Sequence, residues 1–252
     1  MQQTTQQSMI DFLAELAYDP VAFVHGAFPW GADKLEGQQP QDWQLDLLAD
    51  IRDGLKTPGK VIREAIASGH GIGKSALVAW IILWAISTHE DTRGIITANT
   101  DTQLKSKTWA ELSKWYECFI AKHMFTYTAT AIFSNTPGHE KTWRIDAIPW
   151  NEHHSESFAG LHNQGNRILL VFDEASAIAN IIWEVAEGAM TDADTEIIWC
   201  AFGNPTRTSG RFYDCFHRDR ALWKTRKIDS RDVAISNKDL IAEWQETRGE
   251  DS

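Results

Sequence analysis

One stretch, residues 62–88, constrains the fold more than any other part of the chain. A short stretch with apolar residues at 62 and 65–67 ends at Ser68, a glycine-rich loop continues to Gly73, and a long apolar run follows Lys74 and Ser75. The order strand, glycine-rich loop, Gly-Lys-Ser and helix is that of a phosphate-binding loop. Glycine allows backbone angles that turn successive N–H groups inward, and the helix N-terminus adds the positive end of its dipole. This stretch therefore predicts a site for the phosphates of a nucleotide.

The roles within this loop follow from side-chain chemistry. We expect Lys74 to reach the β- and γ-phosphates and the Ser75 hydroxyl to hold Mg²⁺. The general pattern has glycine at position 68, where this chain has serine, so a glycine-rich turn that merely precedes Lys-Ser is the alternative interpretation. The residues predicted to bind the cofactor here are Ser68, Gly69, His70, Gly71, Ile72, Gly73, Lys74 and Ser75.

Composition narrows the class of protein. A length of 252 residues favours one large α/β domain over two small ones. The net charge of −11 argues against a protein that coats nucleic acid, although a local basic patch can still contact DNA. Cys118, Cys200 and Cys215 lack metal-site spacing and are interpreted as reduced thiols. The N-terminus has no signal-peptide pattern, and the apolar run 76–86 is too short to span a bilayer.

The region before the phosphate loop is predicted to be helical. Residues 9–23 have an amphipathic pattern interrupted near Pro20, and we assign 1–35 as an N-terminal helical lead-in to a domain spanning 36–252. Gln44 lies just upstream of the loop, and a carboxamide can both donate to and accept from the edge of adenine. An ordinary surface glutamine is the alternative interpretation.

Strand and helix signals alternate after the loop. Residues 94–98 are predicted to form a buried strand and 102–120 a helix, which suggests βαβ units and a parallel sheet. The segment 124–148 alternates apolar and polar residues around Pro137-Gly138, which predicts a hairpin at a sheet edge.

Two groups of polar residues have competing interpretations. Lys105, Lys107 and Lys114 make the 102–120 helix either a DNA-facing element or a solvated basic face. Three histidines lie near one another without the carboxylate or cysteine pattern that completes a metal site, so we interpret them as polar loop residues. They are His153, His154 and His162.

Residues 168–174 give a second strong sequence signal for a nucleotide site. Residues 168–172 are five consecutive apolar residues, which is typical of a strand buried on both faces, and Asp173 and Glu174 follow directly. Ligands bind at the carboxyl ends of such strands. We expect Asp173 to ligate Mg²⁺ and Glu174 to polarise the water that attacks the γ-phosphate. The alternative is that the pair only caps a helix predicted over 178–190.

The third signal is another buried strand, 196–202, followed by Gly-Asn-Pro-Thr-Arg. At the tip of a strand beside that of Asp173, Asn204 can contact both the γ-phosphate and water, and Thr206 can pass that state to a neighbouring loop. A plain Asn-Pro turn is the alternative. Arg207 and Arg211 could bind phosphate of nucleotide or DNA. A last strand over 222–228 and a closing helix over 237–245 complete the prediction.

Taken together, SGHGIGKS, ILLVFDEAS and FGNPTRTSGRFYD, with DWQ upstream, resemble the ATPase domain of the large terminase subunit of tailed double-stranded DNA phages. The resemblance implies a three-layer α/β P-loop NTPase of the ASCE/RecA-like type, with a mainly parallel central sheet and a β-hairpin edge. It implies Lys74, Asp173, Glu174 and Asn204 as catalytic residues, ATP and Mg²⁺ as cofactors, and Ser75 and Asp173 as metal ligands. Gln44 would contact the adenine, and Thr206 would belong to the coupling motif.

The resemblance also implies a biological setting. Its members couple ATP hydrolysis to the translocation of double-stranded DNA into a procapsid, in the cytoplasm of the infected bacterium and at the portal. The implied partners are double-stranded DNA, the portal protein, the small terminase subunit and, in a docked homo-oligomeric ring, further copies of the chain. We expect weak self-association of the chain alone and no membrane partner.

Three features depart from the family pattern or stay open. His70 stands where these loops commonly carry arginine. An arginine from a neighbouring subunit usually completes the site, and the candidates here are Arg144, Arg167 and Arg207. Family members also carry a nuclease domain with clustered acidic residues, of which this sequence has no counterpart, so we expect no nuclease activity from this polypeptide.

Two other functions would use the same loop. A helicase-like ATPase that remodels nucleic acid would be expected to carry a second RecA-like domain. A module that binds nucleotide only to dock onto a portal would not need Glu174, because a pure binder does not activate water.

Overall fold

A computed structural model of the chain describes residues 2–98, 100–150 and 160–248. An eight-stranded sheet forms its centre, in the order β3-β4-β5-β2-β6-β7-β1-β8. The strands from β5 to β8 in this order are parallel, whereas β4 pairs antiparallel with both β3 and β5. The strands are β1 (Ile62–Ser68), β2 (Arg93–Thr97), β3 (Phe125–Tyr127), β4 (Ala131–Ser134), β5 (Arg144–Ala147), β6 (Arg167–Phe172), β7 (Glu196–Gly203) and β8 (Lys224–Ile228).

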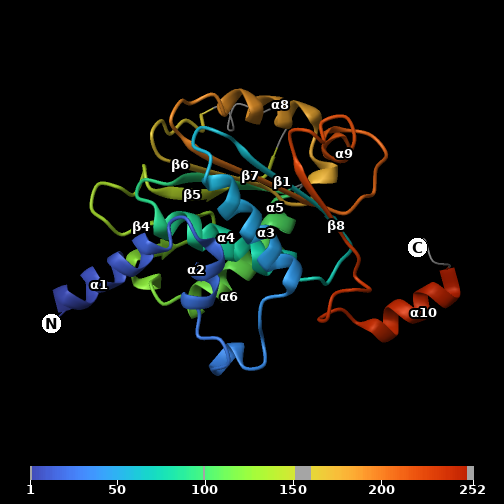
Figure 1. Ribbon diagram of the computed structural model, residues 1–252, viewed down its shortest axis with the longest axis horizontal. Coiled ribbons are helices and arrows are strands. Elements are labelled where there is room, and N and C mark those ends of the chain that lie inside the picture. The colour runs from blue at the N-terminus through green and yellow to red at the C-terminus, as the bar shows by residue number, and fades with distance from the viewer. Residues whose placement is uncertain (1, 99, 151–159, 249–252) are drawn as a thin grey trace.

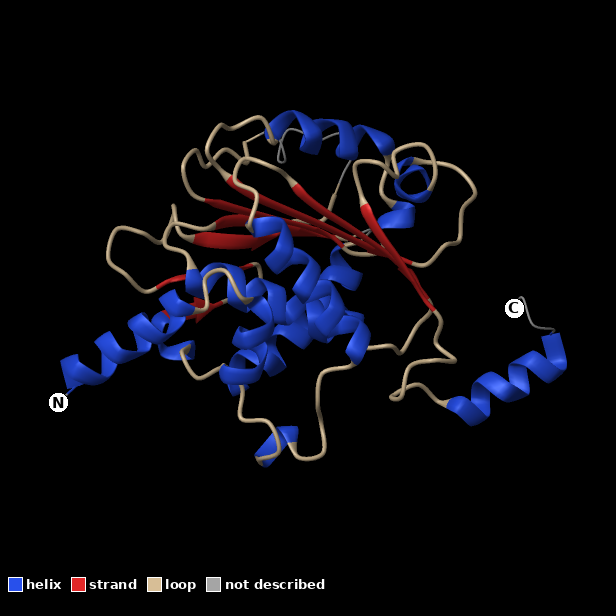
Figure 2. Ribbon diagram, in the orientation of Figure 1, coloured by secondary structure: helices blue, strands red, loops and turns tan. Residues whose placement is uncertain are grey.

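Helices cover both faces of this sheet, so the molecule has three layers (Figures 1 and 2). Helices α2, α3, α4 and α6 lie on one face, α8 and α9 lie on the other, and α10 extends away from the body (Figure 1). The helices are α1 (Gln2–Glu15), α2 (Pro20–Gly26), α3 (Asp42–Leu55), α4 (Lys74–Thr88), α5 (Asp101–Gln103), α6 (Ala110–Cys118), α8 (Asn180–Ala189), α9 (Arg211–Phe216) and α10 (Lys238–Arg248).

The central strands are apolar on both sides because each side faces a helical layer. On β6, Leu169 and Val171 belong to the core under α4, and Leu170 and Phe172 belong to the core under α8. Because side chains alternate along a strand, a continuous apolar run can fill two cores at once. The prediction of a strand buried on both faces is confirmed.

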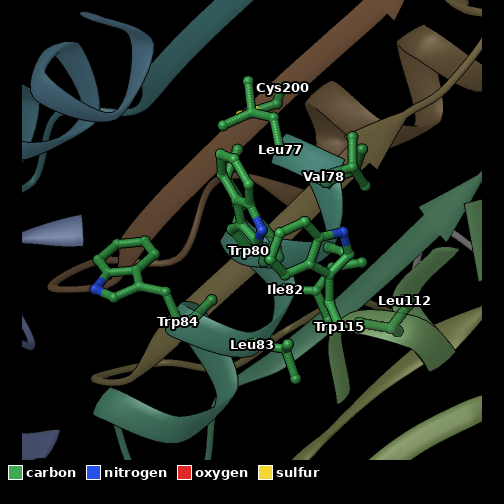
Figure 3. Close-up of a cluster of buried hydrophobic side chains, with 14 of the residues drawn as sticks. Leu77, Val78, Trp80, Ile82, Leu83, Trp84, Leu112, Trp115 and Cys200 are labelled. Carbon is green, nitrogen blue, oxygen red and sulfur yellow. The ribbon is translucent and has the colours of Figure 1, made fainter. Parts of the chain in front are cut away.

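Helix α4, which begins at Lys74, is apolar on all sides and buried from Leu77 onward. A helix of this kind can be stable only inside a protein core. Figure 3 shows Trp80 of α4 beside Trp115 of α6 in this core. The ring of Trp80 packs edge-on against Trp115 of α6 at 4.9 Å, and the indole nitrogen of Trp84 donates to the carbonyl of Leu16. This packing fixes the start of α4, and therefore the phosphate loop.

The N-terminal helices share this core, since Leu13, Phe23 and Val24 are buried in the cluster that contains α4. The division at residue 35 stays a prediction. The three cysteines are free thiols, as expected. Within the part of the chain that the structure describes, no helix is both long and apolar enough to cross a membrane.

The predicted hairpin over 124–148 is confirmed as an antiparallel edge, with Pro137-Gly138 between β4 and β5. The prediction of a single helix over 102–120 is wrong in one respect, because the segment is not one continuous α-helix. It is divided into α5, a π-helical turn (Leu104–Trp109) and α6. The apolar pattern did not reveal the wider turn, because its spacing differs little from that of an α-helix over so few residues.

Candidate active site

The phosphate loop forms between β1 and α4. Gly71 and Gly73 have φ angles of 73° and 89°, a left-handed conformation that other residues rarely adopt. Ser68, in contrast, is the buried last residue of β1. Glycine is therefore not needed at position 68, and the departure from the general pattern leaves the loop intact.

Helix α3 supports this loop from one side. The indole nitrogen of Trp43 donates to the Ile72 carbonyl at 3.3 Å, and Gln44 Nε2 donates to the Gly73 carbonyl at 2.8 Å. Gln44 Oε1 also accepts from the backbone N–H of Gln41 at 2.7 Å, and the Gln44 side chain is buried. Gln44 therefore holds the loop to the start of α3. Its contact with adenine stays a prediction, and the support given by Trp43 was missed although the residue is adjacent in sequence.

The acidic pair Asp173-Glu174 follows β6 directly, at the carboxyl edge of the sheet. Asp173 Oδ1 accepts from the N–H of Glu174 at 3.0 Å, and Asp173 Oδ2 accepts from the hydroxyl of Thr108. Thr108 is buried in the π-helical turn after α5. Glu174 has a φ angle of 53°, a left-handed conformation that is strained for a residue with a side chain. Thr108 could not be predicted from the sequence, because nothing in the local residues marks a π-helical turn.

Strand β7 lies between the strand of the phosphate loop and the strand of the acidic pair. Its parallel pairing with both strands places the following residue, Asn204, between their loops. Lys74 Nζ donates to Asn204 Oδ1 at 2.9 Å, and Asn204 Nδ2 lies 2.7 Å from His70 Nε2. Three segments far apart in sequence therefore converge on one small volume.

Burial shifts the pKa values of Lys74 and Asp173 at this site. It lowers the pKa of the Lys74 ammonium, whereas the Glu174 and Asp173 carboxylates act in the opposite direction. It raises the pKa of Asp173, against the hydrogen bond from Thr108. A bound phosphate would favour the charged ammonium, and a bound cation would favour the charged carboxylate.

The other predicted site residues have clear positions. Ser75 lies half-buried in the first turn of α4 next to Lys74, and the side chain of Ile72 is fully buried, so it offers only its backbone to the loop. The Thr206 hydroxyl donates to Ser176 Oγ at 3.3 Å, which connects the loop after β7 to the segment after Glu174. Binding of the cofactor by Thr206 stays a prediction.

The three candidates for an arginine that completes the site of a neighbouring subunit differ in how far their side chains are exposed. Arg167 is fully buried, donates to Glu196, Thr88 and the Ala17 carbonyl, and stacks on a tryptophan ring. In this position it cannot reach another subunit, so its candidacy is wrong. Arg144 pairs with Asp146 on its own strand.

Arg207, the third candidate, is exposed. Arg207 lines a pocket together with Ser176 and Phe212. Its exposure makes the position of Arg207 compatible with a contact to a neighbouring subunit.

A pocket of about 740 Å³ adjoins the phosphate loop on the β8 side. Gly69, His70 and Ile228 line it, together with the segment after β8. In that segment the Ser230 hydroxyl lies 3.5 Å from the His70 carbonyl oxygen, and Ile235 packs close to Gly73. The prediction of a last strand and a closing helix did not reveal that the connection between them lies against the loop.

The basic residues after β2 are largely paired within the helix. Lys105 pairs with Asp101 and Lys114 with Glu111, which favours the solvated-face interpretation for these two lysines. Lys107 is exposed, and its charge lowers the pKa of Lys74, which places it near the site.

The interpretation of the three histidines as polar loop residues can be followed only for His162. His153 and His154 lie outside the described residues, and His162 pairs with Asp192 at 2.9 Å. A cluster that was not predicted from the sequence lies before β2 and β5, at the amino ends of these strands, and is formed by Glu90, Asp91 and His139. His139 lies 2.7 Å from Asp91 there, which is an ordinary ion-pair contact.

Comparison with known proteins places this geometry in a family. No protein-family model matches the chain. The probable large terminase subunit of Enterobacteria phage P7 is 32% identical in an alignment of 198 positions, which covers 74% of this chain. This chain is a homologue of the large subunit of phage terminases. The matched part is 36% of the length of that relative.

Solved structures agree with this assignment at the level of the fold. The ATPase domain of the large terminase of Thermus phage P74-26 has a TM-score of 0.56 and 15% identity, over 88% of this chain and 94% of that domain. The large terminase of a thermophilic bacteriophage, in complex with ADP, has a TM-score of 0.57 and 15% identity, over 81% of this chain and 49% of that protein. The predicted resemblance and the predicted three-layer P-loop fold with a mainly parallel sheet are confirmed.

Proposed function

We propose that this terminase homologue is the ATPase motor domain of a DNA-packaging machine, which couples ATP hydrolysis to the translocation of double-stranded DNA into a procapsid. The observation that carries the proposal is the convergence of Lys74, Asp173, Glu174 and Asn204 at the carboxyl ends of three adjacent strands. A phosphate-binding lysine alone would suit any nucleotide binder. The acidic pair next to it adds the groups needed for hydrolysis.

In this proposal each side chain has a distinct task. Lys74 and the loop N–H groups bind the phosphates, and Glu174 orients and polarises the attacking water. Asn204 contacts the site from β7 and can respond to whether the γ-phosphate is present. The hydrogen bond from Thr206 to Ser176 connects the loop after β7, which carries both Asn204 and the exposed Arg207, to the segment after Glu174.

The residues present fit a magnesium ion. Mg²⁺ prefers oxygen ligands and is usually held by one or two protein groups together with nucleotide phosphates and water. Asp173 offers a buried carboxylate oriented by Thr108 and by a backbone N–H, and Ser75 offers a hydroxyl. Mg²⁺ bound there would neutralise charge on the phosphates.

The proposed partners are double-stranded DNA, a portal protein, a small terminase subunit and further copies of the chain in a ring, in the cytoplasm of the infected bacterium. Arg207 is the exposed candidate for an arginine that acts on a neighbouring copy. An acidic chain would contact DNA through local basic groups, of which Lys107 is one near the site.

The test is ATP hydrolysis by the purified chain at several protein concentrations, with and without linear double-stranded DNA. We expect Lys74→Ala to lose nucleotide binding and turnover. Glu174→Gln should keep ATP bound while turnover falls by about 10²-fold or more, because only water activation is removed. The exposed residues Lys60 and Glu36 provide matched controls, Lys60→Ala and Glu36→Gln.

Stimulation by DNA or by rising protein concentration would support a motor assembled from several copies. Binding without turnover under every condition would contradict the motor and favour a docking module. Equal turnover in Glu174→Gln and the parent would refute the role of Glu174.

A further inference from the structure

The carboxamide of Asn204 is held between two other side chains. Its oxygen accepts from Lys74 Nζ at 2.9 Å, and its nitrogen lies 2.7 Å from Nε2 of His70. Lys74 lies at the start of α4, His70 lies in the middle of the phosphate loop, and Asn204 follows β7. The contact therefore joins the middle of the phosphate loop to the start of α4 through the residue that follows the neighbouring strand β7.

Hydrogen-bond chemistry fixes the direction of this chain of contacts. A lysine ammonium can only donate, so the atom of Asn204 that faces it must be the carboxamide oxygen. The opposite atom is then the NH₂ group, which can only donate. His70 Nε2 must therefore accept, which requires a neutral imidazole that carries its proton on Nδ1.

We propose that His70 is the positioning residue for Asn204. The inference rests on the proposed function, in which Lys74 binds the phosphates of ATP, and it adds that Lys74 leaves Asn204 to do so. Asn204 then loses one of its two anchors. The contact with His70 is the anchor that remains, and it keeps the carboxamide oxygen directed toward the catalytic volume. A carboxamide oxygen in that direction accepts a hydrogen bond, from Lys74 before ATP binds and from the attacking water afterwards.

Within the described residues, the side chain of His70 makes no other hydrogen bond and no ion pair. His70 is exposed, and its contact with the segment after β8 uses its backbone carbonyl. Truncating the side chain therefore removes the contact with Asn204 while the packing of the loop is kept. This separates a positioning effect from a folding effect.

The kinetic test compares three substitutions in the full chain. His70→Ala removes the acceptor, and we expect kcat for ATP to fall about five- to tenfold while KM changes less than about twofold, the effect of one hydrogen bond. His70→Gln supplies an acceptor oxygen of similar reach, and kcat should stay within about twofold of the parent. His70→Arg supplies only donors and should behave like His70→Ala.

The exposed His123 offers a matched control, since His123→Ala should change neither kcat nor KM. Equal rates for the Gln, Arg and Ala variants at position 70 would overturn the proposal. So would a change confined to KM.

A second measurement does not depend on turnover. Nitrogen-15 NMR of labelled histidine reports which ring nitrogen carries the proton. We expect the parent to show His70 with a proton on Nδ1, and Asn204→Ala to increase the fraction of the Nε2–H tautomer. An identical tautomer distribution in parent and variant would overturn the inference even in an active enzyme. If the chain proves inactive, the proposed function fails while this measurement still decides the contact.

Discussion

The strand that leads into the phosphate loop carries a buried acid, and removing its charge gives the most sharply defined prediction. Glu64 is 1% exposed and lies between Ile62 and Ile66 on the face of β1 that packs toward α3. Burial, and then the Asp50 carboxylate, raise the pKa of Glu64 from 4.5 to about 8, although Lys224 and Arg226 act in the opposite direction. The folded chain therefore holds a proton on this side chain at neutral pH.

The difference between the pKa of Glu64 in the folded and the unfolded chain makes the free energy of unfolding depend on pH. Because the folded-state pKa is the higher one, the stabilisation is complete below about pH 4.5 and is lost as the pH rises to about 8. Each pH unit in that window lowers the free energy of unfolding by about 1.4 kcal/mol, or roughly 5 kcal/mol over the whole window. Glutamine has the shape of the neutral acid and does not titrate, so Glu64→Gln keeps the stabilisation at every pH.

The assay is urea denaturation of parent and Glu64→Gln at pH 5.5, 6.5 and 7.5, followed by tryptophan fluorescence. Between pH 5.5 and 7.5 the parent should lose about 3 kcal/mol relative to the variant. The exposed control Glu36→Gln should run parallel to the parent. Parallel curves for Glu64→Gln and the parent would refute the reasoning, since Glu64 would then be charged in the folded chain.

Two other changes test one buried contact at the amino ends of the strands and one contact at the site. Arg167→Ala leaves the Glu196 carboxylate without its buried partner, so chemical denaturation should show a loss of about 3–5 kcal/mol; a loss below 1 kcal/mol would contradict the structural role of Arg167. Thr108→Val removes the hydroxyl that donates to Asp173 and keeps the shape. We expect about tenfold more Mg²⁺ to be needed for half-maximal ATP hydrolysis at unchanged thermal stability, and an unchanged Mg²⁺ titration would show that Thr108 does not orient Asp173.

The local chemistry of the site could be predicted from sequence because each part is encoded within a few residues. The left-handed glycines of the phosphate loop, the apolar run before Asp173 and the polar residue after β7 are all contiguous signals. Their common location also followed, because ligands bind at the carboxyl ends of parallel strands.

The partners of these residues could not be predicted, because they come from distant segments. Lys74 and Asn204 are 130 residues apart in the chain, and Thr108 and Asp173 are 65 apart. Their contacts depend on the insertion of β7 between β1 and β6 and on one π-helical turn.

Burial shows most clearly the difference between what the sequence determined and what the tertiary structure decided. The sequence alone determined a P-loop fold with a phosphate loop and an acidic pair, since backbone conformation and apolar patterning are local properties. Only the tertiary structure decided that Arg167 is enclosed, that Gln44 holds the loop and that Glu64 keeps a proton. The physical reason is that access to water, and with it charge state and hydrogen-bond partner, depends on the segments that pack around a residue.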